Sequence, residues 1–260
     1  MYIGIDIGGT NIRVASFKSL SSPLDKIIKF DTLNNYKEDL ENIRKNILEL
    51  LDNDIEGIGV GVAAFLSKDK SKIVNANNIN TWNGKNLRSD LENIFQCKVL
   101  VENDATVAAL GEAQFGKGIG LEEFLYFTWG TGIGGTFIRR YGENLLSIPS
   151  QLGHQIIEKD GLLCTCGQHG CLEAYCGGWV INKNPREKIE EYFALGLVNI
   201  LNIHPVDQIV FGGSKALNQK EIVDQIMEKV SNNLKMVVAP EFQFSDLGEK
   251  TGLLGTTVLF

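Results

Sequence analysis

The sequence predicts a mixed α/β protein with two lobes and a cleft between them. The chain has 260 residues, of which 43% are hydrophobic, so it can bury the core of one large domain or of two ordinary ones. Apolar runs and turn residues alternate in the manner of strands and helices. A unit of strand, glycine-rich turn and strand at the start of the chain is followed after residue 120 by a second such unit.

The first lobe is expected to begin with a β-hairpin. "YIGIDI" and "NIRVASF" are rich in Ile and Val and flank a Gly-Gly-Thr turn. Residues 36–51 then place apolar side chains three and four positions apart, which predicts a helix with one apolar face. "IEGIGVGV" predicts a buried strand, "LRSDLENIF" a short helix, and "KVLVEN" a strand that leads into a helix starting near Asp104.

The second lobe repeats this order. "FLYFTW", a glycine-rich turn and "GTFIRR" predict two strands and the turn between them. Residues 187–203 and 219–236 predict helices on either side of the strand "QIVFGG". No low-complexity linker separates the halves, and the glycines of "FGKGIG" mark the expected hinge. We place the first lobe at residues 1–115, completed by 250–260, and the second at 116–249.

Composition excludes several classes of function. The formal net charge is −7, from 32 acidic and 25 basic residues, which disfavours nucleic-acid and anionic-membrane partners because polyanions are bound by Lys and Arg. There is no signal-like start and no run of 18 apolar residues, so a cytoplasmic protein without a membrane partner is expected. The odd number of cysteines, five, argues against a disulfide framework.

Three glycine-rich turns are candidate phosphate sites. "DIGGTNIR" follows a strand, and Gly8 and Gly9 would let the backbone approach an anion. "TWGTGIGG" offers a similar turn, and "VFGGSK" lies between a strand and a helix, where backbone amides could face a nucleotide. Each turn alone could serve only to provide positive φ angles. Gly-x-Gly-x-x-Gly after the first strand and a Walker lysine are both absent, which disfavours Rossmann and P-loop folds.

Together the three turns resemble the phosphate-1, phosphate-2 and adenosine motifs of the actin-like ATPase fold, a duplicated ribonuclease H-like fold. Within it, the chain resembles the ROK family (repressor, open reading frame, kinase) over nearly its whole length. The motifs that carry the resemblance are "DIGGTNIR", "ENDATVAAL", "GTGIGG", "GH" at 153–154, "CTCGQHGCLEAY" and "VFGG".

The cysteine-rich motif predicts a structural zinc site. His154, Cys164, Cys166 and Cys171 supply one imidazole and three thiolates, a complete tetrahedral ligand set with no open position for water. Reduced free thiols in a packed loop are the alternative, and His169 could replace His154 as the nitrogen ligand. The family resemblance favours His154. Cys97 and Cys176 have no evident partners and are interpreted as buried small hydrophobic residues.

The resemblance also implies the roles of the site residues. Asp104 would be the general base of phosphoryl transfer, although an Asp before "ATVAAL" could equally cap a helix. Glu173 would accept from the sugar, the alternative being a surface carboxylate. The implied sugar contacts are Asn103, Asp104, Gln151, His154, Glu173, Ala64 and Asn78. Asp6 would help to hold Mg²⁺ through water. The implied nucleotide contacts are Asp6, Gly8, Gly9, Thr10, Asn11, Arg13, Thr131, Gly132, Gly212 and Gly213.

Three departures from the family pattern concern substrate choice. Gln151 stands where most ROK kinases have Glu, so it brings no charge and can donate as well as accept. Ala63-Ala64 replaces the usual Pro-Gly at the sugar rim. The segment between Cys176 and Ile189, where the family covers the adenine, is shorter than is common.

The resemblance implies a kinase that transfers the γ-phosphoryl group of Mg-ATP to the 6-hydroxyl of a hexose. Glucose is the first expected substrate and N-acetylmannosamine the second, and family habit suggests a homodimer. A ROK repressor is disfavoured, because such repressors carry an N-terminal helix-turn-helix and here the phosphate-1 strand starts at Tyr2. A sugar-binding protein without catalysis is the other alternative, for which Gln151 and Ala64 are the hints.

Overall fold

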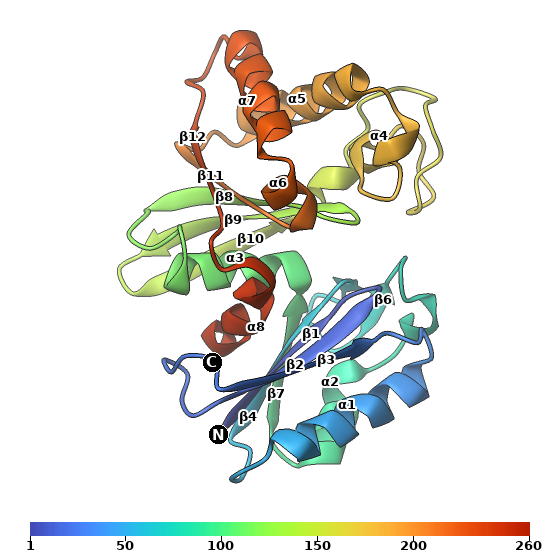
Figure 1. Ribbon diagram of the computed structural model, residues 1–260, viewed down its shortest axis with the longest axis vertical. Helices are drawn as coiled ribbons and strands as arrows, with labels where there is room; N and C mark the ends of the chain where they lie inside the picture. The colour runs from blue at the N-terminus through green and yellow to red at the C-terminus, as the bar shows by residue number, and fades with distance from the viewer. The chain divides into compact units, whose positions relative to one another are not determined.

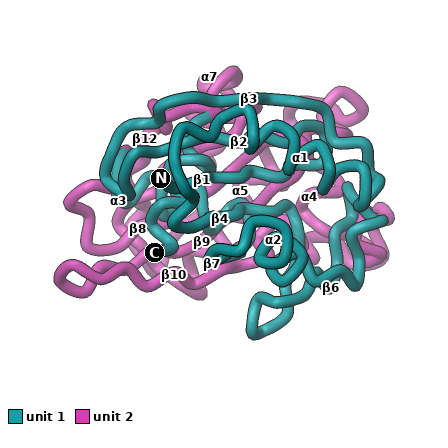
Figure 2. The backbone as a smooth tube through the Cα atoms, turned by 90° about the horizontal axis from the view of Figure 1, so that it is seen from below, with its two compact units in different colours: residues 1–115, 250–260 teal, residues 116–249 magenta.

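Two five-stranded sheets organise the chain in the computed structural model, which describes residues 1–260. The sheets belong to two compact units, shown in separate colours in Figure 2. Unit 1 comprises Met1–Phe115 and Lys250–Phe260, and unit 2 comprises Gly116–Glu249. None of the helices combines the length and the apolar character that a membrane span requires.

The sheet of unit 1 has the strand order β3-β2-β1-β4-β7 (Figure 1). Its strands are β1 (Tyr2–Ile7), β2 (Asn11–Phe17), β3 (Lys26–Asp31), β4 (Gly57–Val62) and β7 (Lys98–Asn103). Its helices are α1 (Tyr36–Leu50), α2 (Leu87–Phe95), α3 (Asp104–Phe115) and α8 (Thr251–Thr256), and β5 (Phe65–Leu66) and β6 (Ile73–Asn75) form a small ribbon. Short 3-10 turns lie at Asn80–Trp82, Gly248–Lys250 and Thr257–Leu259.

The register of the sheet brings three strand ends together. β1 pairs antiparallel with β2 and parallel with β4, and β4 pairs parallel with β7. Ile7 is therefore opposite Val62, and Val62 is opposite Asn103. Since the carboxyl ends of the three parallel strands share one edge, the residues that follow them lie near one another.

Successive side chains of β1 point to opposite faces of the sheet, and helices cover both faces. Ile3, Ile5 and Ile7 belong to the same buried core as Ile43 and Ile47 of α1. The intervening Gly4 points the other way, where an added Cβ would meet Leu253 and Thr256 of α8. The sheet of unit 1 is thus covered on both faces.

The C-terminal helix α8 packs closely against α3. A Cβ on Gly255 would collide with the carbonyl oxygen of Val107, and one on Gly111 would collide with the carbonyl oxygen of Thr251. The two backbones can approach this closely only because both crossing points lack a side chain. Through this contact the last residues of the chain become part of unit 1.

Unit 2 repeats the pattern of unit 1, with the strand order β10-β9-β8-β11-β12. Its strands are β8 (Glu123–Trp129), β9 (Ile133–Tyr141), β10 (Asn144–Ser150), β11 (Gln208–Gly212) and β12 (Glu241–Phe244). Its helices are α4 (Leu172–Cys176), α5 (Arg186–Ile203), α6 (Ser214–Asn218) and α7 (Lys220–Asn233), with 3-10 turns at Leu152–His154 and Ile181–Lys183. As in unit 1, the first three strands are antiparallel and the last two run parallel to the third.

The predicted elements are confirmed, with differences at helix ends and sheet edges. The helix expected over 219–236 is Lys220–Asn233, because the backbone becomes extended at Leu234. The edge strands β3, β10 and β12 were not predicted, and neither was α8. Strand β3 has no fully buried residue, so its sequence shows little of the apolar pattern by which a strand is recognised.

Candidate functional site

The first predicted phosphate turn lies at the carboxyl end of β1. Gly8 N donates to Asn11 O at 3.0 Å and closes the turn, and Thr32 Oγ1 donates to Gly8 O at 2.8 Å. An added Cβ on Gly9 would lie 2.6 Å from Cβ of Asn78, so only glycine fits here without displacing Asn78. No sequence pattern pointed to Thr32, whose part in the turn depends on the pairing of β2 with β3.

Asp6 lies one residue before the end of the same strand and forms an ion pair with Arg13. Arg13 Nη1 donates to Asp6 Oδ2 at 3.2 Å, and each side chain is 17% exposed. The two residues are directly opposite in the β1–β2 register. Two residues predicted to contact the nucleotide are thus brought together, and Asp6 has a carboxylate oriented by its neighbour.

Asn103 is the residue that caps α3. Its Oδ1 accepts from the backbone N–H groups of Ala105 and Thr106 at 3.1 and 3.2 Å. Its Nδ2 donates to Ala64 O at 3.2 Å and to Asp104 Oδ1 at 3.0 Å. The alternative interpretation of Asp104 as the helix cap is therefore wrong, because the preceding residue performs that role.

Asp104 is a half-buried carboxyl group with increased basicity. Burial raises the pKa of Asp104 to about 6, and the negative charge of Asp6 contributes in the same direction. Hydrogen bonds from the Ala105 N–H and from Asn103 lower the pKa but do not cancel these effects. At neutral pH this side chain is ionised, and it accepts a proton more readily than an ordinary aspartate.

The two other predicted phosphate turns meet at the carboxyl edge of the unit 2 sheet. Gly212 of β11 is opposite Thr128 of β8, so the turn that follows β8 lies beside the end of β11. Gly213 has φ +85°, and a Cβ there would lie 2.5 Å from Trp129 O. The structure thus brings together all four residues predicted for this part of the nucleotide site: Thr131, Gly132, Gly212 and Gly213.

Glu173 lies inside unit 2, in α4. Its side chain is 8% exposed, and Oε2 accepts from the backbone N–H of Ile133 at 2.7 Å. The alternative of a surface carboxylate is therefore wrong. The segment after α4 also joins the phosphate turn, where Gly178 N donates to Gly130 O at 3.2 Å. The Gly177-Gly178 pair is the one sequence signal that could have indicated this.

The predicted zinc ligands form one cluster. One ligand atom from each of His154, Cys164, Cys166 and Cys171 lies within 4.8 Å of all the others. His154 Nδ1 is 3.7 Å from Cys164 Sγ, and Cys166 Sγ is 3.7 Å from Cys171 Sγ. Tetrahedral bonds of about 2.3 Å from zinc to sulfur place two sulfurs about 3.8 Å apart, so this donor set fits zinc.

The backbone of the zinc loop explains how the ligands converge. His154 closes the 3-10 turn Leu152–His154, and Cys171 immediately precedes α4. Gly167 and Gly170, with φ +90° and +78°, reverse the chain between them. The alternative ligand His169 bonds elsewhere, with Nδ1 3.0 Å from Gly161 O, and the cluster contains His154 instead.

Two further predicted sugar contacts and the two remaining cysteines differ in burial. Gln151 is exposed, and its carbonyl oxygen accepts from His154 N at 3.0 Å. Ala64 is 6% exposed, and its carbonyl oxygen accepts from Asn103. Cys176 is buried as predicted, and burial raises the pKa of its thiol. Cys97 is only half-buried, so its interpretation as a buried residue is wrong.

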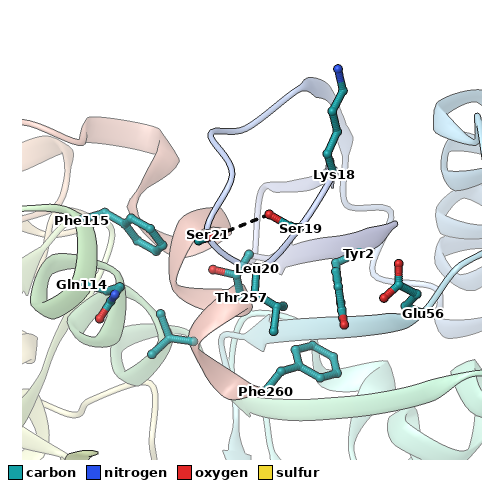
Figure 3. A pocket seen from close by; sticks show the side chains of 11 residues that line it. Tyr2, Lys18, Ser19, Leu20, Ser21, Glu56, Gln114, Phe115, Thr257 and Phe260 are labelled. Carbon is teal, nitrogen blue, oxygen red and sulfur yellow. Dashed lines mark hydrogen bonds between the residues drawn. The ribbon is translucent and has the colours of Figure 1, made fainter. Parts of the chain in front are cut away.

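A separate pocket of about 650 Å³ on unit 1 contains none of the predicted site residues (Figure 3). Tyr2 and Phe260 line it, and Lys18 points outward from its rim. Tyr2 begins β1 whereas Asp6 lies near its other end, so the pocket is at the opposite edge of the sheet from the phosphate turn. Its carboxylate, Glu56, already accepts from the N-terminal amino group of Met1 at 3.0 Å.

Comparisons with known proteins agree with this arrangement. The model of the ROK family matches residues 2–191. A glucokinase from Thermotoga maritima is 33% identical over 195 residues, which cover 73% of this chain and span 61% of that enzyme's length. A glucokinase from Halalkalibacterium halodurans is 27% identical over 98% of this chain and 93% of its own.

The fold is shared with a solved structure. A ROK family glucokinase from Streptomyces griseus, determined in complex with glucose and AMPPNP, superposes with a TM-score of 0.84 and covers 99% of this chain and 98% of its own. At 24% identity this similarity establishes the fold, and it confirms the predicted actin-like, ribonuclease H-like architecture.

Proposed function

Because the chain belongs to the ROK family, we propose that it transfers the γ-phosphoryl group of Mg-ATP to the 6-hydroxyl of a hexose, with glucose as the first candidate. The observation that carries this proposal is Asp104, a carboxylate at a strand end whose pKa is raised to about 6. Both relatives described above are named glucokinases, which supports glucose as the substrate.

In this mechanism Asp104 is the general base. Its carboxylate accepts the proton of the sugar's primary hydroxyl as that oxygen attacks the γ-phosphorus, and the bond to the β–γ bridging oxygen breaks. A base works best when its pKa is near the working pH, and the value of about 6 meets this condition better than that of an ordinary aspartate. Asn103 holds the carboxylate through its Nδ2. Its second amide hydrogen is donated to Ala64 O, so a bond to the sugar's secondary hydroxyls would replace that contact.

The phosphate turns would bind ATP. Backbone N–H groups of Gly9, Thr131 and Gly132 are the donors that we assign to the phosphates, with Gly8, Thr10, Asn11, Arg13, Gly212 and Gly213 as further contacts. The Mg²⁺ that accompanies ATP spreads the charge that builds up on the phosphates, and Asp6 would hold it through water.

The remaining sugar contacts are assigned to Ala64, Asn78, Gln151, His154 and Glu173. His154 and the three cysteines would hold zinc with all four ligand positions filled, so the ion would serve to orient the imidazole. The ring nitrogen of His154 that does not bind zinc would then donate to a sugar hydroxyl.

N-acetylmannosamine is the second candidate substrate, and Gln151 is the observation that favours it. An exposed amide replaces the carboxylate found in most ROK kinases, and an amide can donate to the carbonyl of an acetamido group as well as accept from a hydroxyl. If neither sugar is phosphorylated, a sugar-binding protein without catalysis remains.

The decisive experiment measures ADP release with a panel of hexoses and N-acetylhexosamines. We expect glucose-dependent ADP release, with a product that glucose-6-phosphate dehydrogenase can oxidise. Release with N-acetylmannosamine but not glucose would favour the second candidate. If calorimetry shows that a sugar binds but no sugar in the panel causes ADP release, the assignment as a kinase is contradicted.

We also propose that the protein is cytoplasmic and works as a homodimer. All five cysteines are free thiols in the structure, and a reducing compartment such as the cytoplasm keeps them so. Zinc binding requires thiolates, which disulfides cannot supply. Three apolar side chains of unit 2, Ile203, Met236 and Val238, are 85%, 89% and 88% exposed, and a second copy could cover them. Light scattering after size exclusion tests the dimer, and a mass of one chain would contradict it.

A further inference from the structure

The segment that carries Glu173 is hydrogen-bonded to the second phosphate turn, within unit 2. The segment runs from residue 173 to 179 and includes most of α4, and the turn runs from residue 129 to 133. Four hydrogen bonds join them: Trp129 Nε1 to Cys176 O (2.8 Å), Gly178 N to Gly130 O (3.2 Å), Trp179 N to Thr131 O (3.3 Å) and Ile133 N to Glu173 Oε2 (2.7 Å).

Only one of these four bonds involves a side chain that we propose to contact the sugar. Glu173 Oε2 accepts from Ile133 N, and the side chain is 8% exposed. The carboxylate also lies directly over the turn, because a Cβ added to Gly132 would be 2.5 Å from Oε2. A carboxylate offers about four lone-pair sites, so Glu173 can accept from Ile133 and from a sugar hydroxyl at the same time.

We propose that Glu173 is a positioning residue for the nucleotide as well as a sugar contact, so that one carboxylate couples the affinities for the two substrates. This inference rests on the proposed function and deepens it. Without Glu173, the buried N–H of Ile133 loses its acceptor, and the adjoining turn must rearrange to satisfy it. The turn would then no longer hold its amides ready for the phosphates.

Coupling of this kind is reciprocal. If bound sugar changes the affinity for the nucleotide through Glu173, bound nucleotide changes the affinity for the sugar by the same factor. A change in the turn that displaces Glu173 should also weaken sugar binding, because it moves the carboxylate assigned to the sugar. The chain offers a matched pair of substitutions for this test. A Cβ at Gly132 meets Glu173, whereas a Cβ at Gly130, in the same turn, meets no atom within 4 Å. Neither glycine has a positive φ.

The first experiment measures Mg-ADP binding by calorimetry in the absence of sugar. Glu173→Ala should weaken Mg-ADP binding by about tenfold, although the side chain touches no nucleotide in our assignment. Glu173→Gln keeps a carbonyl acceptor for Ile133 N and should bind Mg-ADP within about twofold of the natural protein. Glu190→Ala is the control, since Glu190 is also buried in unit 2 but pairs with Arg186.

The second experiment measures glucose binding in the absence of nucleotide. Gly132→Ala should weaken glucose binding by about tenfold, because its methyl group displaces the Glu173 carboxylate. Gly130→Ala should leave glucose binding unchanged. Zinc content and circular dichroism check that each variant is folded. If Glu173→Ala does not fold, the unmodified protein decides: its affinity for glucose should change in saturating Mg-ADP, and an unchanged affinity would overturn the coupling.

Two results would overturn the inference. Glu173→Ala could bind Mg-ADP as tightly as the natural protein while losing glucose, which would make Glu173 a sugar contact only. Alternatively, Gly130→Ala and Gly132→Ala could affect glucose equally. Failure of the proposed function looks different, since the unmodified protein would then release no ADP with any sugar.

Discussion

Asn103 is the residue that caps α3, a role for which Asp104 was the alternative candidate. Asn103 also donates to the carboxylate of Asp104, which accepts from the Ala105 N–H as well. Burial and the charge of Asp6 then raise the pKa of Asp104. The sequence predicted both residues as site candidates, but which of them caps the helix depends on side-chain orientation, which no spacing rule supplies.

Asp104→Asn tests the assignment of the base. We expect turnover to fall by at least about a hundredfold, because an amide cannot accept the hydroxyl proton, whereas sugar binding measured by calorimetry should survive. Comparable turnover in the two proteins would show that another group is the base.

The stability of Asp104→Asn tests the raised pKa of Asp104 independently of catalysis. Because the folded state raises the pKa of Asp104 above its unfolded value, ionisation of this group opposes folding as the pH rises through the interval up to about 6. Asp104→Asn should therefore unfold at a higher urea concentration than the natural protein at pH 7, and this advantage should disappear below pH 4. A less stable variant at pH 7 would contradict the raised pKa.

The pH dependence of activity should report the same group. We expect kcat/KM to decrease about tenfold per pH unit below an apparent pKa near 6, because only the ionised carboxylate of the free enzyme is a base. An acid limb near pH 4 would mean that Asp104 is not perturbed, or that it is not the group that limits the rate.

Among the elements, the zinc loop is where a sequence motif and the structure correspond most directly. Closely spaced cysteines and two glycines leave few ways to arrange the chain, so three of the ligands could be identified from a short segment. The fourth was ambiguous, because both His154 and His169 are close in sequence. The fold decides between them: His169 turns to Gly161 O, and His154 joins the cluster.

A matched pair of histidine substitutions tests this element. His154→Asn should lower the zinc content well below one ion per chain and abolish glucose binding, because it removes both a ligand and a sugar contact. His169→Asn should keep zinc and glucose binding. Elemental analysis measures the first property and calorimetry the second.

If His169→Asn loses zinc and glucose binding while His154→Asn keeps both, His169 is the nitrogen ligand. Full zinc content in both variants would leave the three cysteines as the main ligands.

At the scale of the whole molecule, the two sheets have the same strand order and the same mixture of directions. This duplication was visible in the sequence as two units of strand, turn and strand. The part played by α8 was less evident, because the helix is six residues long and contains two glycines. Those features are poor for a free helix but suit a close approach to α3.

Gly255→Ala tests this packing. The added methyl group would collide with the carbonyl oxygen of Val107, and we expect the free energy of unfolding to decrease by about 1 to 3 kcal/mol. Gly61→Ala is the control, since its Cβ would make only ordinary contacts, of 3.4 Å, with the Val107 side chain. Urea unfolding measures both variants, and equal stability of the two would contradict the role of the α3–α8 contact. Zinc content, which depends on unit 2, should not change.

The sequence by itself determined the order of the main elements, the duplicated plan, the three cysteines of the candidate zinc site and the strand ends that carry the candidate site. These features depend on local periodicity, on glycine and on short motifs, which are properties of neighbouring residues. The tertiary structure alone decided which side chains meet across long separations in the chain. Asn103 with Ala64, Glu173 with Ile133 and Gly255 with Val107 are such pairs. Each contact exists because sheet register or helix packing brings the two residues together, and no local pattern contains that information.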